Sequence, residues 1–174
     1  MVSNTFYELH EPQVEKLDDL IKYVSNLLVH FCHVDKIEKI KNMQGKPVKT
    51  LKDLLHESES LEAPFTFDRE EEVHKHIGDY TLFFAGVFPE YLKFLETDNM
   101  IHHPDHIIDH VKTGRRSYGL VAEFCGATGN PDAILYTNLS QHFDINMHCL
   151  NLARKRLDEM GTDPYLQAKT LIID

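Results

Sequence analysis

The chain has 174 residues, of which 42% are apolar and 26% are charged, and this composition predicts one soluble globular domain with a sizeable core. Its net charge of −10 repels the phosphate backbone, and no face rich in Lys or Arg offsets that charge, so nucleic-acid binding is disfavoured. The longest apolar run, Leu82–Phe88, is too short to span a bilayer, which disfavours a membrane protein.

The cysteines and the N-terminus favour a cytoplasmic location. Cys32, Cys125 and Cys149 are widely spaced and odd in number, as expected for reduced thiols rather than a disulfide framework. The opening residues, MVSNTFYELHEP, contain no basic region followed by an apolar stretch, so they do not resemble an export signal.

Apolar residues recur three and four positions apart along nearly the whole chain, the spacing of amphipathic helices. This pattern predicts a single-domain, all-α helical bundle over residues 1–174, with four long helices and two or three short ones. A C-terminal tail, residues 161–174, is expected to pack on the bundle. The long helices are predicted near residues 12–32, 68–89, 103–126 and 131–160, with shorter ones near 37–43 and 48–55.

The second long helix contains the stretch EEVHKHIGDYTLFFAGVFP, which begins highly charged and ends almost wholly apolar. Beyond Ile77 it is apolar on nearly every side, so neighbouring elements should enclose it. Gly78 and Gly86 lie on roughly one side of this helix. Because glycine inside a helix costs about 0.5–1 kcal/mol relative to alanine, the pair predicts close approach of another backbone.

His76 and Asp79 stand where this helix is expected to enter the core. A buried carboxylate is costly unless it is paired or bound to a metal, so Asp79 needs a partner. His76, three residues away on the same face, is the nearest candidate, and Arg69 and Glu72 are also within reach on the same helix. His142 and Asn146 interrupt the apolar stripe of the last helix, and Tyr118 lies on the stripe of the third. The sequence therefore predicts an interior polar cluster of Glu72, His76, Asp79, Tyr118, His142 and Asn146.

This cluster has two interpretations. One is a site for a metal ion or a small ligand, with His76, Asp79, Glu72 and His142 as the ligating groups and Tyr118 and Asn146 behind them. Imidazole together with carboxylate suits iron, manganese or zinc. The other is a hydrogen-bonded network that fixes helix register and binds nothing.

A second histidine pair, His106 and His110, has the i,i+4 spacing with which two imidazoles share a metal. The pair lacks the glutamate of the HExxH motif, so it is a weaker metal candidate than His76 and Asp79. A solvated helix start rich in histidine is the alternative.

The segments HKHIGDYTLFFAGVFPE (His74–Glu90) and VKTGRRSYGLVAEF (Val111–Phe124) resemble a family of uncharacterised bacterial proteins. The resemblance covers the two central helices, under half of the chain. It implies an intracellular bacterial protein, and it carries no activity, fold or ligand.

Two functions therefore follow as hypotheses. The first is a bundle whose interior site binds a metal ion or small molecule. The second is a non-catalytic, homo-oligomeric interaction module, suggested by Leu20, Tyr23 and Leu27, which give the first helix apolar residues beyond its main stripe.

Overall fold

The computed structural model describes residues 16–31, 33–42, 44–59, 67–90 and 105–160. Within these ranges the chain forms seven helices and no strand, which confirms the predicted all-α fold. Four are long: α2 (Leu17–Phe31), α5 (Phe67–Val87), α7 (Asp105–Thr128) and α9 (Phe143–Met160). Three are short: α3 (Val34–Ile37), α4 (Leu51–Glu59) and α8 (Ala133–Gln141). The predicted tail, residues 161–174, lies outside the described residues.

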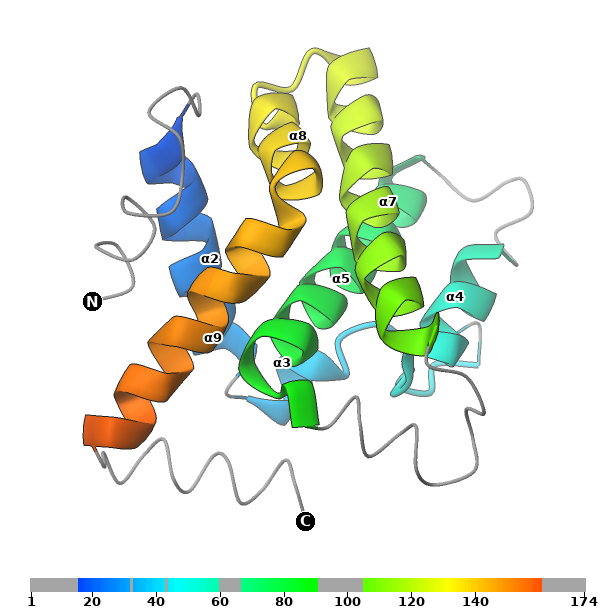
Figure 1. Ribbon diagram of the computed structural model, residues 1–174. Helices are drawn as coiled ribbons and strands as arrows, with labels where there is room; N and C mark the ends of the chain where they lie inside the picture. Colours follow the sequence, from blue (N-terminus) through cyan, green and yellow to red (C-terminus); the bar gives the residue numbers. More distant parts are fainter. Residues whose placement is uncertain (1–15, 32, 43, 60–66, 91–104, 161–174) are drawn as a thin grey trace.

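Helix α5 occupies the middle of the bundle, with α7 and α9 packed along it and α2 and α4 contacting it as well (Figure 1). As the apolar run predicted, every residue from His76 to Val87 is buried. An amphipathic helix would bury one stripe, but this one is covered by neighbours on several sides.

Three buried glycines allow this close packing. A Cβ atom on Gly78 would lie 2.7 Å from ring carbons of Tyr118 in α7. A Cβ on Gly86 would lie 2.7 Å from Leu150 and 3.2 Å from the carbonyl oxygen of Met147 in α9. Gly114 of α7 similarly admits the side chains of Thr81 and Phe143. The predicted approach of a backbone therefore occurs at Gly86, through Met147, whereas at Gly78 an aromatic ring fills the space instead.

Helix α2 reaches α5 through a regular apolar face. Its buried residues are Leu20, Ile21, Val24, Leu27 and Phe31, spaced by one, three and four positions. Leu20 and Leu27, which the sequence suggested as surplus apolar surface, are thus covered within the chain. Val29 remains 64% exposed on the same helix.

Described parts of the chain between α2 and α5 pack on α5, where Ile37 contacts His76 and Lys41 contacts Arg69. After α3, Lys41 and Pro47 form an isolated antiparallel bridge around a turn in which Gly45 has a φ of 74°. The predicted helix near residues 37–43 is therefore wrong beyond Ile37. Helix α4 begins with a cap, because the Thr50 hydroxyl accepts the backbone N–H of Asp53 at 3.1 Å.

Helix α7 ends two residues later than predicted. It continues through Gly126 to Thr128, and Gly129 follows with a φ of 70°. The N–H of Asn130 bonds to the carbonyl of Cys125, and that of Gly129 to the carbonyl of Gly126. This pair of bonds is the Schellman arrangement, which favours glycine at the left-handed position.

The prediction of one long helix over residues 131–160 is wrong in one respect. His142 separates α8 from α9, with a φ of −105° and a ψ of 26°. Its N–H still bonds to Asn138, and its carbonyl accepts the N–H of Asn146. The chain therefore changes direction at one residue while the hydrogen-bond ladder continues on either side.

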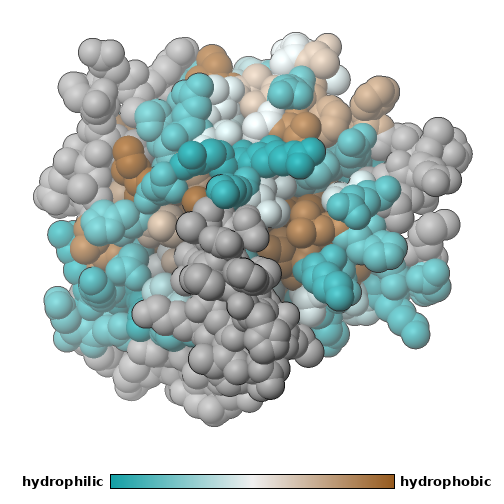
Figure 2. Space-filling model, turned by 45° about the vertical axis from the view of Figure 1, so that its right-hand side comes forward, coloured by the Kyte–Doolittle hydropathy of each residue, from teal (hydrophilic) through white to brown (hydrophobic). Residues whose placement is uncertain are grey.

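The face of the molecule in Figure 2 is mainly polar where it is coloured. Hydrophilic side chains cover much of the coloured surface, and apolar patches are interspersed among them. No helix in the described ranges combines the length and apolar character that crossing a bilayer requires.

Candidate functional site

Asp79 of α5 joins three helices through its side chain. Its Oδ1 atom accepts hydrogen bonds from the Tyr23 hydroxyl of α2 at 2.6 Å and from the Tyr118 hydroxyl of α7 at 2.8 Å. Its Oδ2 atom pairs with the Lys75 ammonium at 2.7 Å, one helical turn earlier. The Asp79 cluster, which comprises Asp79, Tyr23, Tyr118 and Lys75, thus satisfies the predicted need for partners of a buried carboxylate.

The tyrosines of this cluster remain hydrogen-bond donors over a wide pH range. Burial is the largest effect that raises the pKa of Tyr118 well above its ordinary value, and the nearby Asp79 charge adds to it. The same two causes, in the same order, raise the pKa of Tyr23. The Tyr136 ring packs 5.9 Å from that of Tyr23 and 6.2 Å from that of Tyr118, which adds aromatic contact around the carboxylate.

His76 faces the short helix α3 rather than Asp79. Its Nε2 atom lies 2.9 Å from the carbonyl oxygen of Ile37. Because a carbonyl only accepts, Nε2 carries the proton of this bond. Burial is the main cause that lowers the pKa of His76, and the Ile37 bond and Asp79 oppose it. The Phe31 ring packs 5.8 Å from the imidazole, so His76 is held between α2 and α3.

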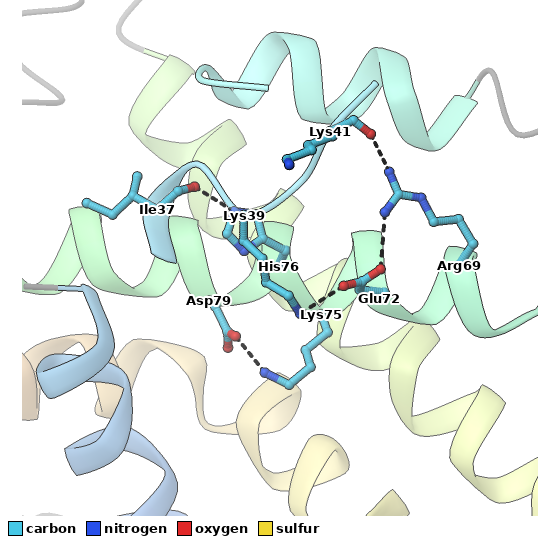
Figure 3. Close-up of polar contacts among 8 residues, drawn as sticks. All are labelled: Ile37, Lys39, Lys41, Arg69, Glu72, Lys75, His76 and Asp79. Carbon is cyan, nitrogen blue, oxygen red and sulfur yellow. Dashed lines mark hydrogen bonds and ion pairs between the residues drawn. The ribbon is translucent and has the colours of Figure 1, made fainter. Parts of the chain in front are cut away.

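Glu72 lies one turn before His76 and holds two cations. Its Oε1 atom pairs with Lys39 at 2.8 Å, and its Oε2 atom pairs with Arg69 at 3.1 Å (Figure 3). The hydrogen bond from Lys39 is the largest effect that lowers the pKa of Glu72. Arg69 also donates to the carbonyl of Lys41 at 2.6 Å and approaches Glu57 at 3.4 Å. These contacts fix the segment after α3 onto α5.

A cavity of about 390 Å³ opens between α2, α3 and α5, and every residue of its lining except Phe31 has a polar or charged side chain. We call it the α3 cavity. Buried His76 and Asp79 contribute to its wall, as do the half-buried Glu72 and Lys75. In full, the lining consists of His30, Phe31, Asp35, Lys36, Lys39, Glu72, Lys75, His76 and Asp79. The structure therefore brings three of the four predicted ligating residues to one cavity.

The fourth, His142, does not line this cavity. It lies half-buried at the junction of α8 and α9. Asn146 is fully buried on α9, and neither its Oδ1 nor its Nδ2 atom has a hydrogen-bond partner among the described residues. Of the predicted outer residues, only Tyr118 is bonded to Asp79. The interior cluster is therefore smaller than the sequence suggested.

The weaker pair lies on α7. His110 is half-buried there, and the side chain of His106 lies outside the described part of the structure. Among the described residues, no three His, Cys, Asp or Glu side chains are grouped so that they could hold a metal ion.

Sequence reasoning missed three residues of the site. Tyr23 was assigned to apolar surface, although it is the one hydroxyl-bearing side chain among Leu20, Tyr23 and Leu27. Lys75 precedes Asp79 by four residues, the spacing of a helical ion pair, which is a signal present in the sequence. Lys39 reaches Glu72 from a different segment, and no local pattern indicates that contact.

Comparison with known proteins found no match to this chain among family models, curated sequences or solved structures.

Proposed function

We propose that this protein binds a small polar molecule in the α3 cavity. The observation that carries the proposal is the cavity itself, about 390 Å³ in volume, with charged groups from α3, α5 and the segment between them converging on its wall. That volume is in the range of small-molecule sites. A lining dominated by lysine, carboxylate and imidazole suits a polar molecule better than an apolar one.

A small molecule is better supported than iron, manganese or zinc. Lysine ammonium groups already pair with the carboxylates of Asp79 and Glu72, and the Nε2 atom of His76 is bonded to Ile37. A metal would have to displace these partners and would face the positive charges of Lys39 and Lys75. An organic ligand can instead form hydrogen bonds with the groups at the cavity wall.

The test is an amide NMR screen with chemically distinct probes: glutamate, citrate, inorganic phosphate, spermidine and glucose. At least one probe is expected to shift the amide signals of Lys39, Lys75 and His76 in a saturable manner. A second cavity of about 230 Å³ between α2 and α8, lined by Lys16, Lys22 and Asp132 among others, provides an internal control. If no probe shifts the amide signals at the α3 cavity, or if the shifts are equal at both cavities, the proposal is wrong.

The rival, a homo-oligomeric interaction module, has less support. The apolar residues that suggested it, Leu20 and Leu27, are buried against the rest of the chain. Isolated exposed side chains such as Val29 are ordinary on monomeric proteins. Light scattering distinguishes the two ideas, because the rival requires a dimer or a larger assembly.

We also propose a cytoplasmic location. The support is that Cys125 and Cys149 are buried free thiols, as is usual in a reducing compartment. If the protein is unfolded without a reducing agent and treated with a thiol-specific label, both Cys125 and Cys149 should react, which tests whether they are free thiols.

A further inference from the structure

Formal charge alone does not select a ligand for the α3 cavity. Its lining contains three lysines, Lys36, Lys39 and Lys75, and three carboxylates, Asp35, Glu72 and Asp79. Each lysine contacts one of these carboxylates, at 3.5, 2.8 and 2.7 Å respectively. The choice between an anionic and a cationic ligand therefore depends on which partner of each pair is available.

The two carboxylates on α5 are held by other groups besides the lysines. Asp79 accepts two tyrosine hydroxyls in addition to Lys75, and its side chain is only 9% exposed. Glu72 is bonded to Arg69 as well as to Lys39. Each carboxylate would thus keep at least one strong donor if its lysine turned away.

The lysines are in the opposite situation. The side chains of Lys39 and Lys75 are 53% and 37% exposed, and an ammonium group has three N–H donors on a flexible stem. Within the described residues, each forms one ion pair, with Lys75 also lying 5.0 Å from the Tyr23 ring centroid. Both groups therefore have donor capacity that a ligand can use without leaving Asp79 or Glu72 unpaired.

We infer that the ligand of the α3 cavity carries an oxyanion, a carboxylate or a phosphate, and that Lys39 and Lys75 bind it from two sides. This inference rests on the proposed function and specifies the chemical class of its ligand. At the two α5 carboxylates, Asp79 and Glu72, a cationic ligand would instead compete with the tyrosine hydroxyls and with Arg69.

The experiment measures the affinity of the full chain for inorganic phosphate and for citrate by NMR titration at constant ionic strength. Lys39→Gln and Lys75→Gln are each expected to weaken binding about ten-fold or more, because each removes a charge-assisted hydrogen bond. Both variants should fold, since Glu72 keeps Arg69 and Asp79 keeps two tyrosines. Lys22→Gln, which alters a lysine of the separate α2–α8 cavity, should leave the affinity unchanged.

Glu72→Gln supplies a readout that a merely structural role of the lysines would not change. Removing this charge frees Lys39, so phosphate or citrate should bind roughly two- to five-fold more tightly. Tighter binding of one anion than of the other identifies which oxyanion the site prefers.

The outcomes separate the two proposals. Binding of spermidine or glucose at Lys39, Lys75 and His76 without binding of phosphate or citrate would overturn the oxyanion inference and leave the binding function in place. Anion binding that neither lysine variant weakens would also overturn it. If no probe shifts the amide signals at the α3 cavity, both the binding function and the oxyanion inference are wrong.

Discussion

Gly78 offers a sharp test of how α5 and α7 pack beside Asp79. In an unobstructed helix, Gly78→Ala would stabilise the protein by about 0.5–1 kcal/mol, because alanine loses less conformational freedom on folding. Here the added Cβ would lie 2.7 Å from the Cδ1 and Cε1 atoms of Tyr118. The Tyr118 ring is completely buried, and its hydroxyl is tied to Asp79, so the ring has little room to move.

The expected net effect follows from these opposing contributions. Overpacking a well-filled core costs about 1–3 kcal/mol. After the helical gain is subtracted, Gly78→Ala should lower the free energy of unfolding by about 0–2.5 kcal/mol, where an unobstructed alanine would raise it. Part of this loss arises because a displaced Tyr118 hydroxyl moves away from the Asp79 carboxylate.

Urea denaturation measures this change, and Gly126→Ala is the matched control. Gly126 also lies within a helix, α7, but a Cβ there would meet no atom within 4 Å. The control should raise the free energy of unfolding by about 0.5–1 kcal/mol. A Gly78→Ala protein that gains as much stability as the Gly126→Ala control, with an unchanged m-value, would refute the close contact between Gly78 and Tyr118.

Three further predictions concern buried polar groups. Asp79→Ala should lower the free energy of unfolding by about 3–5 kcal/mol, since it leaves two tyrosine hydroxyls and Lys75 without their acceptor. Urea denaturation measures this loss. The control is Asp79→Asn, which keeps an acceptor oxygen and should lose less stability. The His76 imidazole shares the wall of the α3 cavity with Asp79, Lys39, Lys75 and Glu72, and burial lowers its pKa. His76 therefore binds a proton more readily in the unfolded chain than in the folded chain. Stability should therefore decline as the pH falls through about 6.5, the unfolded value, and a thermal-melt series should show a shallower decline for His76→Gln. Asn146→Leu should raise the free energy of unfolding by about 1–2 kcal/mol, because it removes two buried polar atoms that lack partners; a loss of stability would show that the amide has a structural role.

The helical spacing of apolar residues was sufficient to predict the fold class and the burial of α5. The same physical rule that makes a buried carboxylate costly predicted that Asp79 must have partners. Tyr118 entered the predicted cluster through its position on the apolar stripe of α7, and it does bond to Asp79. His76 and Glu72, which lie nearer in sequence, bond to other groups. These successes rest on local periodicity and on the energetics of a single group. Neither requires knowledge of how the helices are arranged in space.

The features of the site that the sequence did not reveal depend on how the helices are arranged in space. Tyr23 meets Asp79 across 56 positions, so its role follows from the way α2 lies on α5. His142 lies at the junction of α8 and α9 and not on the wall of the α3 cavity, and ideal helical geometry contains no signal for that junction. Lys39 reaches Glu72 from an irregular segment, where no periodic pattern applies.

The two oxygens of Asp79 connect stability to the proposed site in different ways. Oδ1 ties α2 and α7 to α5 through the half-buried Tyr23 and the buried Tyr118, whereas Oδ2 holds Lys75, which lines the α3 cavity. Removing the whole carboxylate therefore disturbs folding and ligand binding together. Substituting Lys75 alone leaves both tyrosine bonds in place, so a loss of anion binding in Lys75→Gln with nearly unchanged unfolding would assign the lysine to the ligand and the tyrosines to the fold.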